Sequence, residues 1–69
     1  MKENFESVLK RKRVEKGYTL QKLSELSGIT YVQINNLENG KNKPTALTIS
    51  RLAKALECSY EELFELTLK

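Results

Sequence analysis

The sequence contains no histidine or tryptophan and only one cysteine, Cys58. One thiol cannot form an internal disulfide, and without histidine the usual zinc ligand sets are missing. Glycine occurs three times, proline occurs once, and no apolar run exceeds three residues. Such runs cannot span a bilayer, and no basic segment followed by an apolar one indicates a secretory signal. We therefore expect a cytoplasmic protein without metal, cofactor, small-molecule ligand or membrane partner.

The length of the chain limits it to one domain. With 69 residues and 8.0 kDa, it lies near the lower size at which a single apolar core supports folding. Its 39% hydrophobic and 30% charged residues are typical of a compact globular protein. Histidine, clustered carboxylates and a glycine-rich phosphate loop are all missing, so we predict one domain over residues 1–69 that is not an enzyme.

Charge is divided unevenly along the chain. Residues 1–56 hold eleven Lys or Arg against five Glu, a surplus of six positive charges. Residues 57–69 hold one Lys against four Glu, a surplus of three negative charges. A basic body with an acidic end suggests a polyanionic partner on one side, although an ordinary solvated surface fits the charge alone equally well.

Apolar residues recur at helical spacing, and residues that start or stop helices fall between them. We predict a helix at about residues 3–16, ending at Gly17, and a second that begins at Thr19 and leads to Gly28. A third begins at Thr30 and stops at Asn39, a fourth follows Pro44, and a fifth begins at Ser59. Capping boxes are expected at Thr30 with Gln33 and at Ser59 with Glu62. The apolar residues of the second helix are Leu20, Leu23 and Leu26, and the apolar face of the fourth is Ala46, Ile49, Leu52, Ala53 and Leu56.

Residues 19–38 are patterned more tightly than two amphipathic helices require. Small Ser24 allows two helices to cross closely, and Gly28 permits the positive φ that a short turn needs. Ile29, Ile34 and Leu37 then anchor the next helix at a steep angle. This pattern predicts a helix-turn-helix.

The stretch "GYTLQKLSELSGITYVQINNLENGK" followed by "KPTALTISRLAKALECSYEEL" resembles the phage repressor and Cro type of helix-turn-helix regulator. The resemblance covers roughly residues 5–64. It implies an all-α, compact five-helix bundle of the lambda-repressor-like type, with the third helix in the major groove of double-stranded DNA. It also implies a sequence-specific transcriptional repressor or activator of bacterial or prophage origin, acting near the nucleoid as a homodimer.

The same resemblance assigns residues to the DNA. Asn and Gln suit the N6 and N7 atoms of adenine and Val suits a thymine methyl group, so we expect A·T pairs in the site, although the Tyr31 hydroxyl could equally reach a phosphate. A plain solubility role for the Lys and Asn loop is the alternative to phosphate contact. The expected base-contacting residues are Tyr31, Val32, Gln33 and Asn36, and the expected backbone-contacting residues are Thr19, Leu20, Thr30, Asn39, Lys41 and Lys43.

Arg13 falls four residues after Leu9 and should point partly inward, where a charge needs a partner. The resemblance implies a structural ion pair with Glu38; the alternative is an exposed arginine of little energetic value. Two positions depart from the family pattern. Leu20 stands where many relatives have a DNA-contacting glutamine, and Glu57 replaces a glycine that commonly follows the fourth helix.

Two features leave alternatives open. Cys58 lies among apolar positions and should be an inert thiol, since no histidine can activate it as a nucleophile. The C-terminal helix and tail, residues 59–69, could be core plus a frayed end, but we favour a self-association surface. This acidic and apolar end also supports a competing function, that of an antitoxin or co-regulator whose main role is to bind a protein partner.

Overall fold

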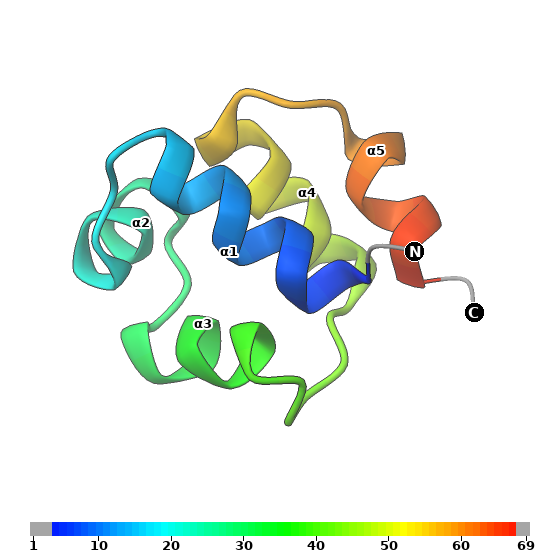
Figure 1. Cartoon of the computed structure of the whole chain (residues 1–69), viewed down its shortest axis with the longest axis horizontal. Helices are drawn as coiled ribbons and strands as arrows, with labels where there is room; N and C mark the ends of the chain where they lie inside the picture. Colours follow the sequence, from blue (N-terminus) through cyan, green and yellow to red (C-terminus); the bar gives the residue numbers. More distant parts are fainter. Residues whose placement is uncertain (1–3, 68–69) are drawn as a thin grey trace.

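The computed structural model describes residues 4–67, which form five α-helices and a final 3-10 turn without any β-strand (Figure 1). The all-α prediction is therefore confirmed. The first helix begins later than predicted, at Phe5, and residues 1–3 and 68–69 of the predicted elements lie outside the described part. The elements are α1 (Phe5–Glu15), α2 (Leu20–Ser27), α3 (Tyr31–Glu38), α4 (Ala46–Leu56), α5 (Tyr60–Phe64) and η1 (Glu65–Thr67).

Each helix begins after a residue whose side-chain oxygen accepts a backbone N–H of the first turn. These N-cap residues are Asn4, Thr19, Thr30, Thr45 and Ser59. Such caps satisfy amides that have no partner within the helix. The reciprocal half of the predicted capping boxes is not formed. The Gln33 side chain makes no hydrogen bond to another described residue, and the Glu62 carboxylate lies 2.6 Å from Lys12 Nζ instead.

The C-terminus of α4 is closed by an unusual residue. Glu57 adopts the left-handed conformation with φ 59° and ψ 42°, while its N–H donates to Lys54 O and the N–H of Cys58 donates to Ala53 O. These are the two bonds of a Schellman motif, in which glycine normally takes the left-handed position. The Glu57 carboxylate lies 2.5 Å from Lys16 Nζ, so α1 reaches the residue that ends α4.

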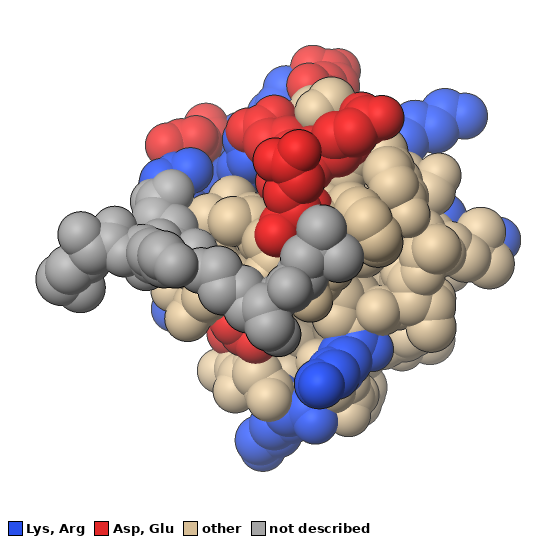
Figure 2. Space-filling view, turned by 90° about the vertical axis from the view of Figure 1, so that its right-hand side faces the viewer, with Lys and Arg blue, Asp and Glu red and all other residues tan. Residues whose placement is uncertain are grey.

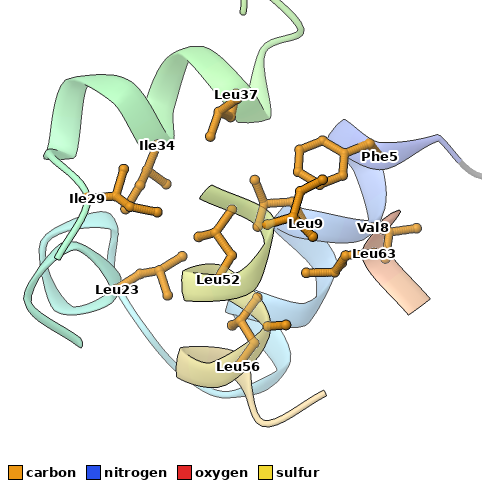
Figure 3. Close-up of a cluster of buried hydrophobic side chains, with 12 residues drawn as sticks. Phe5, Val8, Leu9, Leu23, Ile29, Ile34, Leu37, Leu52, Leu56 and Leu63 are labelled. Atoms are coloured by element: carbon orange, nitrogen blue, oxygen red, sulfur yellow. The ribbon is translucent and has the colours of Figure 1, made fainter. Parts of the chain in front are cut away.

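The core lies where α1, α3, α4 and α5 meet, with Leu23 and Ile29 closing it from the side of α2 (Figure 3). Ile34 and Leu37 point from α3 toward Leu52 and the side chains of α1 (Figure 3). The fully buried side chains are Leu9, Leu23, Ile34, Leu37, Ile49, Leu52 and Leu63.

Two apolar residues of the predicted second and fourth helices are exposed. The buried line of α2 runs through Leu23 and Ser27, four residues apart, and Leu26 falls beside it with 47% of its surface exposed. Ala46 is exposed because it begins α4, whose buried line starts at Thr48 and Ile49. The sequence pattern alone could not show where along each helix the core begins.

The arrangement leaves one helix with a free outer side. α3 packs against α1 and α2 and runs along the lower edge of the molecule, while α4 packs against both α2 and α5 (Figure 1). Within residues 4–67, no helix combines the length and the apolar character that crossing a membrane would require.

Candidate nucleic-acid interface

The turn between α2 and α3 is held by three hydrogen bonds. Gly28 adopts φ 76° and donates its N–H to Ser24 O at 2.9 Å. Ser24 Oγ donates to Ile29 O at 2.5 Å, and the N–H of Ile29 donates to Ser27 Oγ at 3.2 Å. Ile29 itself is buried. Our sequence interpretation gave Ser24 only its small size, whereas its hydroxyl also closes the turn and so fixes the direction in which α3 leaves α2.

The inner and outer sides of α3 are sharply different. Ile34 and Leu37 are buried, while Tyr31 is 51% and Val32 is 64% exposed, and Gln33 is exposed beside them. Asn36 is half-buried. Large apolar side chains exposed together indicate a contact surface. With eight residues, α3 is about 12 Å long, and a major groove about 12 Å wide can admit a helix.

The loop after α3 is tied to the helix by a Schellman motif. The N–H of Gly40 donates to Leu37 O at 3.3 Å, and the N–H of Lys41 donates to Asn36 O at 2.9 Å. The backbone of Lys41 is therefore fixed to the same helix that carries Asn36. The side chains of Lys41 and Lys43 are exposed, which places two cations at the end of α3.

The residues expected to contact phosphates differ in whether their side chains already make hydrogen bonds within the protein. Thr19 Oγ1 accepts the N–H of Lys22, and Thr30 Oγ1 accepts the N–H of Gln33, so each hydroxyl keeps its proton for a phosphate oxygen. Leu20 is half-buried against the core. Asn39 is exposed, and its Nδ2 donates to both the backbone and the side-chain oxygen of Asn35.

Arg13 and Glu38 form the ion pair that connects α1 to the end of α3. Arg13 Nε lies 2.6 Å from Glu38 Oε2, and Arg13 Nη2 lies 3.2 Å from Glu38 Oε1. The remaining guanidinium nitrogen, Nη1, donates to Tyr18 O at 2.8 Å. Only 12% of the Arg13 side chain and 5% of the Glu38 side chain are exposed. The pair is therefore a largely buried, two-pronged contact, the geometry for which arginine is suited.

Charge is separated across the molecule. Figure 2 shows the acidic side chains gathered over the upper part, with basic side chains beside them, whereas basic side chains project from the lower edge, the side on which α3 lies in Figure 1. A negatively charged partner would therefore approach most favourably from the side of α3.

Comparisons with known proteins agree with this geometry. The family model described as helix-turn-helix, HTH_3, matches residues 9–63. The chain belongs to this helix-turn-helix family. A crystal structure of an HTH_3 family transcriptional regulator from Vibrio cholerae has a TM-score of 0.82 and 28% sequence identity, over 88% of this chain and 34% of that one.

Three curated relatives are helix-turn-helix regulators or repressors. The uncharacterized HTH-type transcriptional regulator y4dJ of Sinorhizobium fredii is 40% identical over 77% of this chain and 69% of its own length. The HTH-type transcriptional repressor RghR of Bacillus subtilis is 39% identical over 88% of this chain, and the competence pilus inhibition repressor of Acinetobacter baylyi is 37% identical over 75%. The matches span 46% and 47% of these two repressors. Family and fold together make the chain a DNA-binding transcriptional regulator of the helix-turn-helix type.

Two cations near the helix-turn-helix were missed by the sequence reasoning. Lys22 is exposed in the first turn of α2, where a positive charge opposes the helix dipole. That unfavourable placement was a usable signal that the residue serves a contact outside the helix. Arg51 comes from α4, and its Nη1 lies 3.0 Å from the position that a Cβ on Gly28 would occupy. No signal in the sequence linked Arg51 to Gly28, because the two residues meet only through the packing of α2 on α4.

The titratable groups with shifted pKa values lie away from α3. The hydrogen bond from Lys12 to Glu62 lowers the pKa of Glu62 and raises that of Lys12, and the bond from Lys16 to Glu57 does the same for that pair. Burial raises the pKa of the Cys58 thiol, which favours the unreactive protonated form. Residues 4–67 contain no group of three or more His, Cys, Asp or Glu side chains arranged to hold a metal ion.

Proposed function

We propose that this helix-turn-helix protein is a sequence-specific regulator that inserts α3 into the major groove of double-stranded DNA. The observation that supports it most directly is the opposition of the two sides of α3, with Ile34 and Leu37 buried and with Tyr31 and Val32 exposed. More than half of each of these two residues is left exposed by the described chain, and exposed apolar groups of this size favour contact with a partner. Tyr31, Val32, Gln33 and Asn36 reach base edges, and sequence preference comes from them.

Phosphate contacts hold the helix in register. Lys41 and Lys43 lie at the end of α3, and the hydroxyls of Thr19 and Thr30 keep a free proton at the first turns of α2 and α3. Such contacts determine orientation and carry no sequence information. Leu20 packs its exposed part against sugar or thymine methyl groups, in place of the amide that many relatives have at this position.

Regulation follows from occupancy. The protein binds as a homodimer to two half-sites about one helical turn of DNA apart, roughly 34 Å, and blocks or recruits polymerase according to the position of the site. The dimer surface includes the described part of the C-terminal segment, residues 59–67. The site of action is chromosomal DNA in the bacterial cytoplasm.

A titration of duplex DNA at several salt concentrations tests the proposal. Each phosphate neutralised contributes about −0.9 to the slope of log K against log salt, so contacts from two lysines require a clearly negative slope, to which the uncharged hydroxyls add nothing. Selection of bound duplexes from a random pool then identifies the preferred sequence. Salt-independent or undetectable binding to every duplex would contradict the proposal and would favour the alternative of an antitoxin or co-regulator that binds a protein.

A further inference from the structure

Two cations of α4 have no hydrogen-bond or ion-pair partner among the described residues. Arg51 and Lys54 lie about one turn apart on the solvent side of this helix, and both side chains are exposed. By contrast, three cations of α1 and the residue that follows this helix each lie within ion-pair distance of a carboxylate: Arg11, Lys12, Arg13 and Lys16. Arg51 and Lys54 therefore present positive charge that neither the fold nor the proposed contacts of α3 use.

These cations border a hollow between α2 and α4. The hollow has a volume of about 460 Å³, and its lining includes Tyr18, Leu26 and Ala55 together with the two cations. Leu26 is the exposed leucine that the core leaves out. Glu57, also on the rim, has its charge balanced by Lys16. An apolar floor with a cationic rim fits an acidic protein segment better than it fits a phosphate, which has no use for the apolar floor.

The chain itself carries a segment with the complementary chemistry. Glu61 on α5 and Glu65, the next residue after that helix, are exposed and have no partner among residues 4–67, whereas Glu57 and Glu62 are paired with lysines. Tyr60 and Phe64 stack with ring centroids 5.3 Å apart and stay half-buried, so the same segment offers aromatic surface. Two residues separated by one helical turn are about 5–6 Å apart, so the spacing of Glu61 and Glu65 matches that of Arg51 and Lys54.

We propose that α5 of a second copy docks in the α2–α4 hollow, with Glu61 and Glu65 opposite Arg51 and Lys54. This inference rests on the proposed homodimer and names the surface that receives its C-terminal segment. α4 packs against both α2 and α5, so the helix that carries the two cations also touches the helix that begins the acidic segment. Two copies related by a two-fold axis make the contact twice, which closes a dimer.

Leu47 supports the same arrangement. It lies one turn before Arg51 on the solvent side of α4, and 63% of it is exposed. In the docked arrangement, the paired outer sides of two α4 helices bury this exposed side chain near the axis.

Sedimentation of the full chain at several protein and salt concentrations tests the docking through charge reversal. The double variant Arg51→Glu, Lys54→Glu is expected to raise the dimer dissociation constant at least about tenfold, as is Glu61→Lys, Glu65→Lys. Combining all four changes restores association, since the charges are exchanged. The control variant Lys10→Glu, Arg11→Glu changes the net charge by the same amount as Arg51→Glu, Lys54→Glu, but at exposed positions of α1. Its dimer dissociation constant should stay near that of the unaltered protein. Thermal melting of each variant establishes that it is folded.

Three results would overturn the docking: a chain that stays monomeric at every concentration, unchanged association in both double variants, or no restoration in the fourfold variant. Titration of the same variants with a duplex carrying one half-site separates this inference from the proposed function. If loss of Arg51 and Lys54 lowers the salt slope on that duplex, the two residues contact phosphate and the docking is wrong. If the charges govern self-association but no duplex binds, the proposed function alone fails.

Discussion

Arg13 Nε lies 2.6 Å from Glu38 Oε2, so a side chain of α1 holds the last residue of α3. Because both side chains are nearly buried, each is stable there only while the other is present. The orientation of α3, the proposed DNA-contacting helix, thus depends on a residue far from it in the sequence.

Removing one member of this pair should be costly. We expect Glu38→Ala to lower the free energy of unfolding by about 3 kcal/mol or more, because the buried Arg13 charge loses its partner. Urea denaturation measures the change. Glu15→Ala is the matched control. Glu15 pairs with Arg11 at 3.8 Å on an exposed part of α1, the helix that carries Arg13, and an exposed pair contributes at most about 1 kcal/mol. If both variants lowered the free energy of unfolding equally, burial would not determine how much the Arg13–Glu38 pair contributes to stability.

Replacing the proposed base-contacting residues should change which sequences bind. Asn36→Ala is expected to lose about 1–3 kcal/mol of discrimination at one base pair, and Val32→Ala should weaken preference for a thymine. Selection from a random duplex pool, followed by titration of single-base variants of the winning site, measures both. An unchanged preference in Asn36→Ala would show that its half-buried side chain does not reach the bases.

The lysines after α3 should act on all sequences alike. Lys41→Ala and Lys43→Ala each remove one proposed phosphate contact, so each should reduce the salt slope by about 1 and weaken preferred and random duplexes by the same factor. Lys10→Ala removes a charge from the outer side of α1 and should leave the slope nearly unchanged. A sequence-dependent loss in either loop variant would instead indicate a base contact.

The turn before α3 can be tested with two glycines in the same backbone conformation. Gly28 and Gly17 have φ of 76° and 75°, but a Cβ on Gly28 would meet Arg51 Nη1 at 3.0 Å, while one on Gly17 would meet nothing within 4 Å. Gly17→Ala should therefore cost only the left-handed strain, about 1–2 kcal/mol, and Gly28→Ala somewhat more. Adding Arg51→Ala to Gly28→Ala should remove the excess, as measured by thermal or urea unfolding. If the excess persisted without Arg51, crowding by that side chain would not be its cause.

Acid should weaken the contact between α1 and α5. The pKa of Glu62 is lowered from its ordinary 4.5, chiefly by the hydrogen bond from Lys12, so its contribution to stability is complete above pH 4.5 and is lost as the pH falls through the folded value. The pKa of Lys12 is raised from 10.5, so the same pair also weakens as the pH rises beyond that value. Glu62→Gln should flatten the acid limb of a plot of urea midpoint against pH. Glu25→Gln changes an exposed carboxylate of α2 that has no ion-pair partner among the described residues, and it should leave the acid limb unchanged.

Much of this fold was predictable from local chemistry. Thr19, Thr30 and Ser59 cap helices where predicted, because a hydroxyl at that position satisfies an amide of its own first turn. Ile34 and Leu37 are buried as predicted, because they recur at helical spacing. The second half of each capping box was not predictable, since Glu62 could bind either its own helix or Lys12 and only the position of α1 decides between them.

The sequence by itself determined where α2, α3 and α5 begin and which sides of α3 face inward and outward, since both depend on residues within a few positions of one another. Packing alone decided that Leu26 and Ala46 stay outside the core and that Arg51 lies over Gly28. Each of these positions depends on where a neighbouring helix lies. That placement is set by the angle and distance at which helices remote in the sequence cross.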